Sequence, residues 1–278
     1  ASSGALGFDG QGWPWEKPLK WLGLLDPSLF TVVIKTLTWY PTKGNLRWYN
    51  PLGSIRLIRN GVVNAVGLSN PGIDRWCREV APRLDFSYPP LIASIASDSL
   101  LHLQGMAERL NDFDFMGMEL NTSCPTSESG LIGDDDAAQK IIERCETVKR
   151  FSRFPLILKL SVTHDLEAIV PAVEGMVDAF SINSVPWARI FPDKRSPLAA
   201  LGGGGVSGKA AQPFTWKTVE LLSQKTKVPV IGPSIWEFSD IAKLRQLGAK
   251  AIGFGSIFLR YPWRPTLFVR RDRKERKK

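Results

Sequence analysis

The chain has 278 residues, of which 44% are hydrophobic and 23% charged, and its net charge is +9. This is the ordinary composition of a soluble globular protein with a sizeable core, at a length where α/β barrels commonly form one domain. No apolar run reaches the roughly 18 residues of a membrane-spanning helix, and no secretory signal is visible, so we expect no membrane partner.

Apolar, β-branched runs recur along the chain, and helical patterns lie between most of them. Near-continuous apolar runs are typical of parallel strands that are buried on both faces. The predicted strands cover residues 31–38, 90–97, 115–123, 155–162, 179–185, 228–234 and 249–256. The predicted helices cover residues 16–25, 99–112, 134–151, 163–176, 213–226 and 237–248, with Ser, Thr or Asp caps at their starts.

Seven such strands are one short of a closed (β/α)8 TIM barrel. We interpret residues 1–5 as the last part of a first strand whose beginning is absent from this sequence. Residues 39–72 are too long for a plain crossover, so they are predicted to insert extra strands over the C-terminal mouth. No second domain or internal repeat is visible, and residues 1–278 are therefore predicted to form a single α/β domain.

The C-terminal residues 270–278 are strongly basic, with seven basic and two acidic side chains. We expect a solvated, fraying tail. The alternative is a contact with nucleic acid or with an anionic membrane surface.

Cysteine and histidine are both scarce. Three cysteines, Cys77, Cys124 and Cys145, indicate a reducing compartment rather than a disulfide scaffold. The two histidines, His102 and His164, have no second ligand at metal spacing, so we expect no metal and no Ser-His-Asp triad. Any acid–base chemistry must then use another residue type.

In (β/α)8 barrels the chemistry lies at the carboxyl ends of the strands. Two lysines in one mouth need an anionic partner, because burying an unpaired ammonium is costly. Asparagines offer paired donors and acceptors to a flat heterocycle, and glycine loops expose N–H groups to a phosphate. The predicted mouth therefore suits a phosphorylated planar cofactor and a small anionic ring. Its candidates are Lys35, Thr36, Asn64, Gly67, Leu68, Asn121, Cys124, Lys159, Asn183, Ser184, Gly232, Gly255, Ser256 and the loop 202–208.

Each candidate has a structural alternative. Lys159 could be a rim residue, the glycine run a flexible loop, and Asn183 the cap of a turn. Cys124 could be a small core side chain, as free cysteines often are. Their shared position at predicted strand ends, on one face of the barrel, favours the functional interpretation.

Six sets of motifs, in sequence order, resemble those of the dihydroorotate dehydrogenases, in particular the soluble class 1 branch that uses a cysteine base. They are "IKTLT" with "PTKGN" (34–45), "NAVGLSNPG" (64–72), "ELNTSCP" (119–125), "LKLSV" (158–162), "INSV" with "GGGGVSG" (182–208) and "GFGS" (253–256). The resemblance extends over essentially the whole chain. It implies a cytoplasmic flavoprotein with FMN on the barrel, which oxidises (S)-dihydroorotate to orotate in pyrimidine (UMP) biosynthesis.

The resemblance also implies a role for each site residue. Cys124 would remove the C5 proton of dihydroorotate, Lys35 would lie between flavin and substrate, and Lys159 would stabilise charge at the flavin N1/O2 edge. The implied substrate contacts are Lys35, Asn64, Gly67, Leu68, Asn121, Thr126, Asn183 and Ser184. The implied FMN contacts are Ala1, Ser2, Lys35, Thr36, Asn121, Lys159, Asn183, Gly204, Gly205, Ser207, Gly232, Ser234, Gly255 and Ser256.

Three places depart from the family pattern. Thr126 stands where the family has an Asn that contacts substrate, Pro233 and Ser234 stand where it has a Gly-Gly pair, and Trp187 replaces a smaller residue. Proline has no N–H, so one phosphate donor is lost unless the Ser234 hydroxyl substitutes for it. Two alternatives follow: a related FMN-barrel pyrimidine reductase or dehydrogenase with an altered substrate, or a flavin- or phosphate-binding barrel without turnover.

The motifs leave the electron acceptor open. "NAVGLSNPG" is closer to the NAD-linked kind, which works with an iron–sulfur electron-transfer subunit, than to the fumarate-linked kind. With three cysteines, this chain has no cysteine cluster for such a centre of its own. The resemblance further implies a homodimer, and nucleic acid is not an expected partner.

Overall fold

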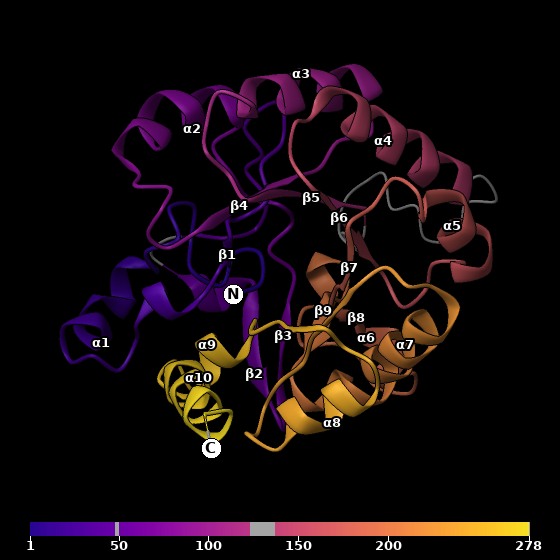
Figure 1. Cartoon of the computed structure of the whole chain (residues 1–278). Coiled ribbons are helices and arrows are strands. Elements are labelled where there is room, and N and C mark those ends of the chain that lie inside the picture. Colours follow the sequence, from indigo (N-terminus) through magenta and orange to yellow (C-terminus); the bar gives the residue numbers. More distant parts are fainter. Residues whose placement is uncertain (48–49, 123–136, 278) are drawn as a thin grey trace.

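The computed structural model describes residues 1–47, 50–122 and 137–277. Figure 1 shows a curved sheet on the inside, with helices around its outer face. The strand order is β1-β4-β5-β6-β7-β10-β11, and every neighbouring pair is parallel. The strands are β1 (Val32–Val33), β4 (Leu91–Ile95), β5 (Gly117–Asn121), β6 (Leu156–Leu160), β7 (Ala179–Ile182), β10 (Val230–Gly232) and β11 (Ala251–Ile252). All seven predicted strands are confirmed, and each is shorter than the apolar run that predicted it.

The N-terminal segment lies between the two edges of this sheet. The N–H of Val33 donates to the carbonyl of Ala1 (3.0 Å), and the N–H of Ser2 donates to the carbonyl of Phe254 (2.8 Å). Residues 1–5 thus occupy the place of the eighth strand, but the prediction that they form a strand is wrong. They form a turn, because Gly4 adopts a positive φ of 76° and bends the chain after only two bonds to its neighbours. The architecture is the predicted α/β TIM barrel.

Ten α-helices lie in the described part of the chain. They are α1 (Lys17–Trp21), α2 (Ile73–Glu79), α3 (Leu100–Leu110), α4 (Ala137–Phe151), α5 (Leu166–Val173), α6 (Trp187–Ile190), α7 (Gln212–Lys225), α8 (Asp240–Gln246), α9 (Ile257–Arg260) and α10 (Arg264–Glu275). The six predicted helices correspond to α1, α3, α4, α5, α7 and α8. Short 3-10 turns lie at 14–16, 27–29, 51–53, 81–83, 199–201 and 209–211.

Local sequence explains where the longer crossover helices begin and which face they bury. The Ser99 side chain caps α3 by accepting from the N–H of His102, and the Asp165 carboxylate caps α5 by accepting from two N–H groups. The buried residues of α3 fall at helical spacing, so one stripe faces the sheet: Leu103, Met106, Ala107 and Leu110.

A second, antiparallel sheet lies over the carboxyl ends of the barrel strands. Its order is β2-β3-β9-β8, with β2 (Ile55–Ile58), β3 (Gly61–Asn64), β9 (Gly205–Ser207) and β8 (Val185–Pro186). The prediction of extra strands within 39–72 is confirmed. Two further strands complete it: β8 comes from the residues after β7, and β9 comes from the glycine-rich region. A small apolar cluster of Val63, Ala65, Leu198 and Val206 supports this sheet.

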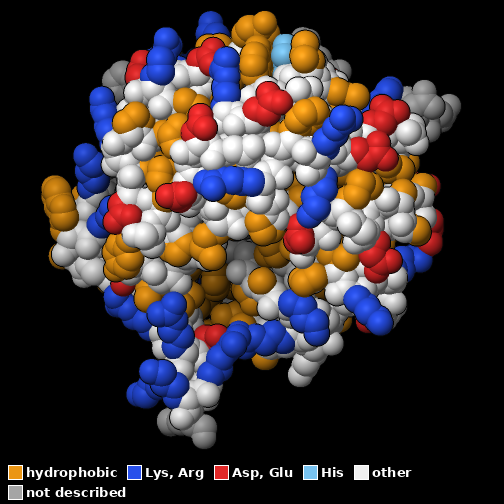
Figure 2. Space-filling model, turned by 45° about the horizontal axis from the view of Figure 1, so that its top comes forward, with side chains coloured by type: hydrophobic (Ala, Val, Ile, Leu, Met, Phe, Trp, Pro, Cys, Tyr) orange, Lys and Arg blue, Asp and Glu red, His pale blue; other side chains and the backbone are white. Residues whose placement is uncertain are grey.

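The C-terminal residues are mostly solvated, as the sequence predicted, but up to residue 275 they form a helix and not a fraying tail. Residues 270–275 continue α10, and the Asp272 carboxylate accepts two hydrogen bonds of 2.8 Å from Arg245 of α8. The Arg271 guanidinium lies 4.0 Å from the ring centroid of Phe238. Figure 2 shows Lys and Arg side chains along the end that projects at the bottom of the view. These contacts hold the segment as a helix, although most of its side chains are exposed.

Candidate active site

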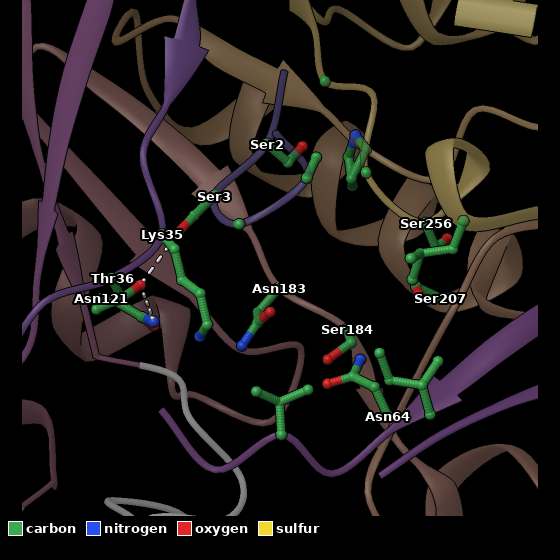
Figure 3. A pocket seen from close by; sticks show the side chains of 18 of the residues that line it. Ser2, Ser3, Lys35, Thr36, Asn64, Asn121, Asn183, Ser184, Ser207 and Ser256 are labelled. Atoms are coloured by element: carbon green, nitrogen blue, oxygen red, sulfur yellow. Dashed lines mark hydrogen bonds between the residues drawn. The ribbon is translucent and has the colours of Figure 1, made fainter. Parts of the chain in front are cut away.

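A pocket opens at the carboxyl ends of the parallel strands, under the antiparallel sheet (Figure 3). It collects residues from the N-terminal segment, from the ends of β1, β5, β6, β7, β10 and β11, and from β3 and β9. Three kinds of wall can be distinguished: an amide and ammonium wall, a hydroxyl and glycine wall, and an apolar rim.

The amide and ammonium wall combines two lysines with three asparagines. Lys35 follows β1 and Lys159 lies in β6, and both are buried yet line the pocket. Figure 3 shows the Lys35 and Asn183 side chains pointing toward one another across the cavity. Asn121 ends β5 and donates from Nδ2 to the Thr36 hydroxyl at 3.3 Å. This wall presents fixed donors and positive charge to a planar, electron-rich ligand.

Beneath this wall lies a buried ion pair that the sequence reading missed. The Lys159 Nζ is 3.2 Å from Oε1 of Glu119, and the two side chains are 10% and 4% exposed. Two hydroxyls also bond to the carboxylate: Ser94 donates to Oε1 at 3.0 Å and Ser181 to Oε2 at 3.1 Å. The available signal was a charged residue in the apolar run of β5, beside a lysine in the apolar run of β6.

The hydroxyl and glycine wall faces the amide wall. It is formed by Ser2, Ser207, Ser234, Gly253, Gly255 and Ser256. Ser234 adopts a positive φ of 66°, a conformation that favours glycine, and its hydroxyl lies 3.2 Å from that of Thr215. Its carbonyl accepts from Nε2 of Gln212 at 2.9 Å. Helix α7 thus holds the loop after β10 in its strained shape, with the Ser234 residue at the pocket.

An apolar rim of tryptophans was not anticipated either. Trp13 and Trp15 both line the pocket, and their rings are stacked with centroids 5.1 Å apart and planes 2° apart. The indole N–H of Trp13 donates to the carbonyl of Gly4 at 3.1 Å. Because both residues lie in the connection before α1, which no periodic pattern describes, the sequence held no signal for them.

The pocket brings together most of the predicted site residues. Fourteen of them line it: Ser2, Lys35, Thr36, Asn64, Gly67, Leu68, Asn121, Lys159, Asn183, Ser184, Ser207, Ser234, Gly255 and Ser256. Cys124 and Thr126 lie outside the described residues, so their placement stays a prediction.

Four predicted FMN contacts, Ala1, Gly204, Gly205 and Gly232, are not among the residues that line the pocket. Ala1 bonds to Val33 at the barrel edge, and Gly205 pairs with Asn64 and Pro186 in the antiparallel sheet. A Cβ on Gly204 would lie 2.5 Å from the Asn64 carbonyl oxygen, and one on Gly232 would lie 2.9 Å from Ala249. Gly204 and Gly232 therefore allow neighbouring segments to pack closely, whereas the sequence predicted that they contact a phosphate.

Neither histidine is among the residues that line the pocket. His102 stacks on Trp39, with ring centroids 5.2 Å apart. His164 accepts at Nδ1 from the N–H of Ser161, and burial lowers its pKa to about 4. Among the described residues, no group of three or more His, Cys, Asp or Glu side chains is placed to hold a metal ion. Nor does any described helix have the length and apolarity needed to cross a membrane.

Comparison with known proteins decides between the possible families for this pocket. The family model described as "Dihydroorotate dehydrogenase" matches residues 5–262. The chain belongs to the dihydroorotate dehydrogenase family. It is 32% identical over 236 residues to dihydroorotate dehydrogenase A (fumarate) of Lactobacillus helveticus, covering 82% of this chain and 75% of that protein. It is 34% identical over 269 residues to the catalytic subunit of dihydroorotate dehydrogenase B (NAD(+)) of Desulforudis audaxviator, covering 94% and 82%.

The fold has a solved counterpart among the dihydroorotate dehydrogenases. The ligand-free enzyme of Eimeria tenella superposes with a TM-score of 0.63 at 20% identity, covering 87% of this chain and 75% of that one. At that identity the likeness supports the barrel alone. The expected membership of the class 1 branch rests on the sequence relatives and is confirmed by them.

Proposed function

We propose that this chain oxidises (S)-dihydroorotate to orotate in pyrimidine biosynthesis, with FMN as its cofactor. The observation that carries the proposal is one pocket at the strand ends that joins Lys35, Asn64, Asn121 and Asn183, in a chain of the dihydroorotate dehydrogenase family. Dihydroorotate is a small anionic ring with amide edges. Asparagine side chains pair with such edges, and a lysine offsets the carboxylate charge.

The residues of the pocket fit FMN by their chemistry. The hydroxyl and glycine wall offers short donors to a phosphate, and the amide and ammonium wall offers flat, charged contacts to a ring system. Ser207, Ser234 and Ser256 would hold the phosphate end, while Thr36, Asn121 and Lys159 would hold the ring. FMN, when bound there, supplies the acceptor for the hydride that leaves C6 of the substrate.

The substrate end would be formed by the asparagines and the segment after β3. Gly67 and Leu68 line the pocket with positive φ angles of 67° and 55°. This conformation turns the segment over the cavity, so that its backbone N–H groups are available to a carboxylate. Lys35, 9% exposed, would contact both substrate and ring, and its burial excludes competing water.

The base in the proposal is Cys124, which would take the C5 proton as a thiolate. Its assignment rests on the "ELNTSCP" motif, because residues 123–136 lie outside the described part. The other two thiols do not suit the role. Burial raises the pKa of Cys77 to about 11 and that of Cys145 to about 12, and neither lines the pocket.

The proposal also covers the electron acceptor of the reduced flavin and the partner subunit. The names of the relatives include a fumarate-linked enzyme and an NAD-linked catalytic subunit at similar identity. We favour the NAD-linked kind with an iron–sulfur partner subunit, because that relative matches over 94% of this chain. A homodimer, a single FMN-binding domain over residues 1–278 and a cytoplasmic location complete the proposal.

The decisive experiment is anaerobic mixing of FMN-loaded protein with dihydroorotate, followed by loss of the flavin absorbance near 450 nm. Rapid bleaching is expected for the wild type, and bleaching slowed at least 100-fold for Cys124→Ser, since a general base contributes roughly 10²–10⁴ in rate. Cys77→Ser serves as the matched control and should bleach like the wild type. Bound but unbleached flavin would reject dihydroorotate as the substrate and direct attention to Thr126.

A further inference from the structure

Glu119 has no place in the proposed reaction, yet it is a deeply buried charged group next to the pocket. It lies in β5, two residues before Asn121, and is 3% exposed. It is not among the residues that line the pocket, whereas its partner Lys159 is. Seen from the cavity, the carboxylate therefore lies behind the ammonium. It acts on a bound ligand through Lys159 and through its field, not by contact.

Four neighbouring strands cooperate to hold this carboxylate. Ser94 of β4 is opposite Glu119 in the register, and Lys159 of β6 is opposite Ser181 of β7. All three neighbours bond to Glu119: Ser94 and Lys159 to Oε1, and Ser181 to Oε2. Parallel strands in register turn these side chains to the same, interior face of the barrel. The arrangement is thus built by the sheet and leaves the carboxylate little freedom to move.

The same hydroxyl chain reaches the pocket wall. The Ser94 and Thr36 hydroxyls are 2.9 Å apart, and Thr36 accepts from Nδ2 of Asn121 at 3.3 Å. Thr36 and Asn121 both line the pocket. Glu119 therefore connects to Thr36 and Asn121 through Ser94, and directly to Lys159, and all three of these residues line the pocket.

We propose that Glu119 is a positioning residue that lowers the reduction potential of the bound flavin by holding and partly neutralising the Lys159 ammonium. The inference rests on the proposed function, because Lys159 is taken to face the flavin ring. Reduction adds negative charge to that ring, and an uncompensated ammonium beside it favours the reduced form. A carboxylate 3.2 Å behind the ammonium offsets part of this effect in a poorly solvated interior.

The test is the two-electron reduction equilibrium of FMN in Glu119→Gln, measured against a reference dye with an enzymatic reductant and without dihydroorotate. Glutamine keeps the shape and can still accept from Ser94 and Ser181, but it carries no charge. We expect a shift toward reduced flavin of at least tenfold, which corresponds to about 30 mV. Glu119→Asp, which keeps the charge, should return most of the way to the wild-type equilibrium. Glu108→Gln, an exposed carboxyl on α3, makes the same change in net charge and should leave the equilibrium unchanged.

A purely structural role would give a different result. Breaking a buried ion pair is strongly destabilising, so Glu119→Gln would then unfold at lower denaturant concentration with an unchanged reduction equilibrium. That outcome would overturn the proposal. If Glu119→Gln does not fold, Lys159→Met is compared with Lys159→Met/Glu119→Leu, in which both charges are absent. The double variant should favour reduced flavin at least tenfold more than the single one, and equality would overturn the proposal.

Failure of this inference and failure of the proposed function give separate signals. If the reduction equilibrium of the flavin changes in Glu119→Gln but dihydroorotate does not bleach it, the substrate is rejected and the inference stands. If dihydroorotate bleaches the flavin but the reduction equilibrium is the same in Glu119→Gln and the wild type, the function stands and the inference is rejected. A wild-type chain that binds no FMN would overturn both.

Discussion

At the scale of single residues, Glu16 shows how burial beside the pocket changes an acid. It is 3% exposed, and its Oε2 accepts from the N–H of Trp13 at 2.8 Å. Burial raises its pKa from 4.5 to about 7, although the Trp13 hydrogen bond and the charge of Lys20 act in the opposite direction. The folded protein therefore binds one more proton than the unfolded chain between these two pH values, and Glu16 lowers stability as pH rises from about 4.5 to 7.

Glu16→Gln should remove this pH dependence. Glutamine can still accept from Trp13, and it has no charge to desolvate. Relative to the wild type, the free energy of unfolding should gain on the order of 2 kcal/mol between pH 4.5 and 7.5, with little further change above. Urea unfolding of both proteins at pH 4.5, 6 and 7.5 would measure it. A constant difference across this range would show that folding does not raise the pKa of the Glu16 carboxyl.

At the scale of elements, the contacts of α10 explain why its exposed, basic end is a helix and does not fray as the sequence predicted. Charge density alone predicts a solvated segment. The segment is largely exposed, and the structure in addition places Asp272 against Arg245 and Arg276, and Arg271 over the Phe238 ring. Hydrogen bonds from Arg245 and the charge of both arginines lower the pKa of Asp272. A tail can be distinguished from a docked helix only when the surface beneath it is known.

Asp272→Asn should loosen α10 without unfolding the barrel. The pair with Arg245 is bidentate but partly exposed, so we expect a loss of about 1 kcal/mol at neutral pH. Because the pKa of Asp272 is lowered, the difference from the wild type should diminish as pH falls below about 4. Hydrogen exchange within residues 264–275 would report the loosening. Glu275→Gln, in an exposed pair with Arg271, is the control and should exchange like the wild type.

The other elements divide between patterns that local sequence explains and patterns that packing explains. Apolar runs predicted every barrel strand, because strands buried on both faces must be apolar throughout. The strand expected over 31–38 has only two residues, although Ile34 and Leu37 still donate to the carbonyls of Ile92 and Ser94 in β4. Between these two bonds, Lys35 and Thr36 line the pocket. Gly105 in α3 looks like a weak point of a helix, yet a Cβ there would lie 2.6 Å from the Trp39 ring. Only the neighbour explains that glycine.

At the scale of the whole molecule, the pocket joins parts of the chain from Ser2 to Leu259. A ligand that contacts all of them binds the folded state and not the unfolded chain. FMN at 100 times its dissociation constant should therefore stabilise the protein by about 2.7 kcal/mol and raise Tm by several degrees. Calorimetry with increasing FMN would measure this, with riboflavin as the control that lacks the phosphate. A Tm that does not respond to FMN would count against the cofactor assignment.

The sequence by itself determined the class of fold, the family and most of the polar residues at the pocket, because strand periodicity and motif order are local properties. Only the tertiary structure decided which side chains meet. It paired Glu119 with Lys159 across two strands, brought Trp13 and Trp15 to the rim, and used Gly204 and Gly232 for close packing. These outcomes depend on register and on distances between segments that are far apart in the chain, and no local pattern encodes either.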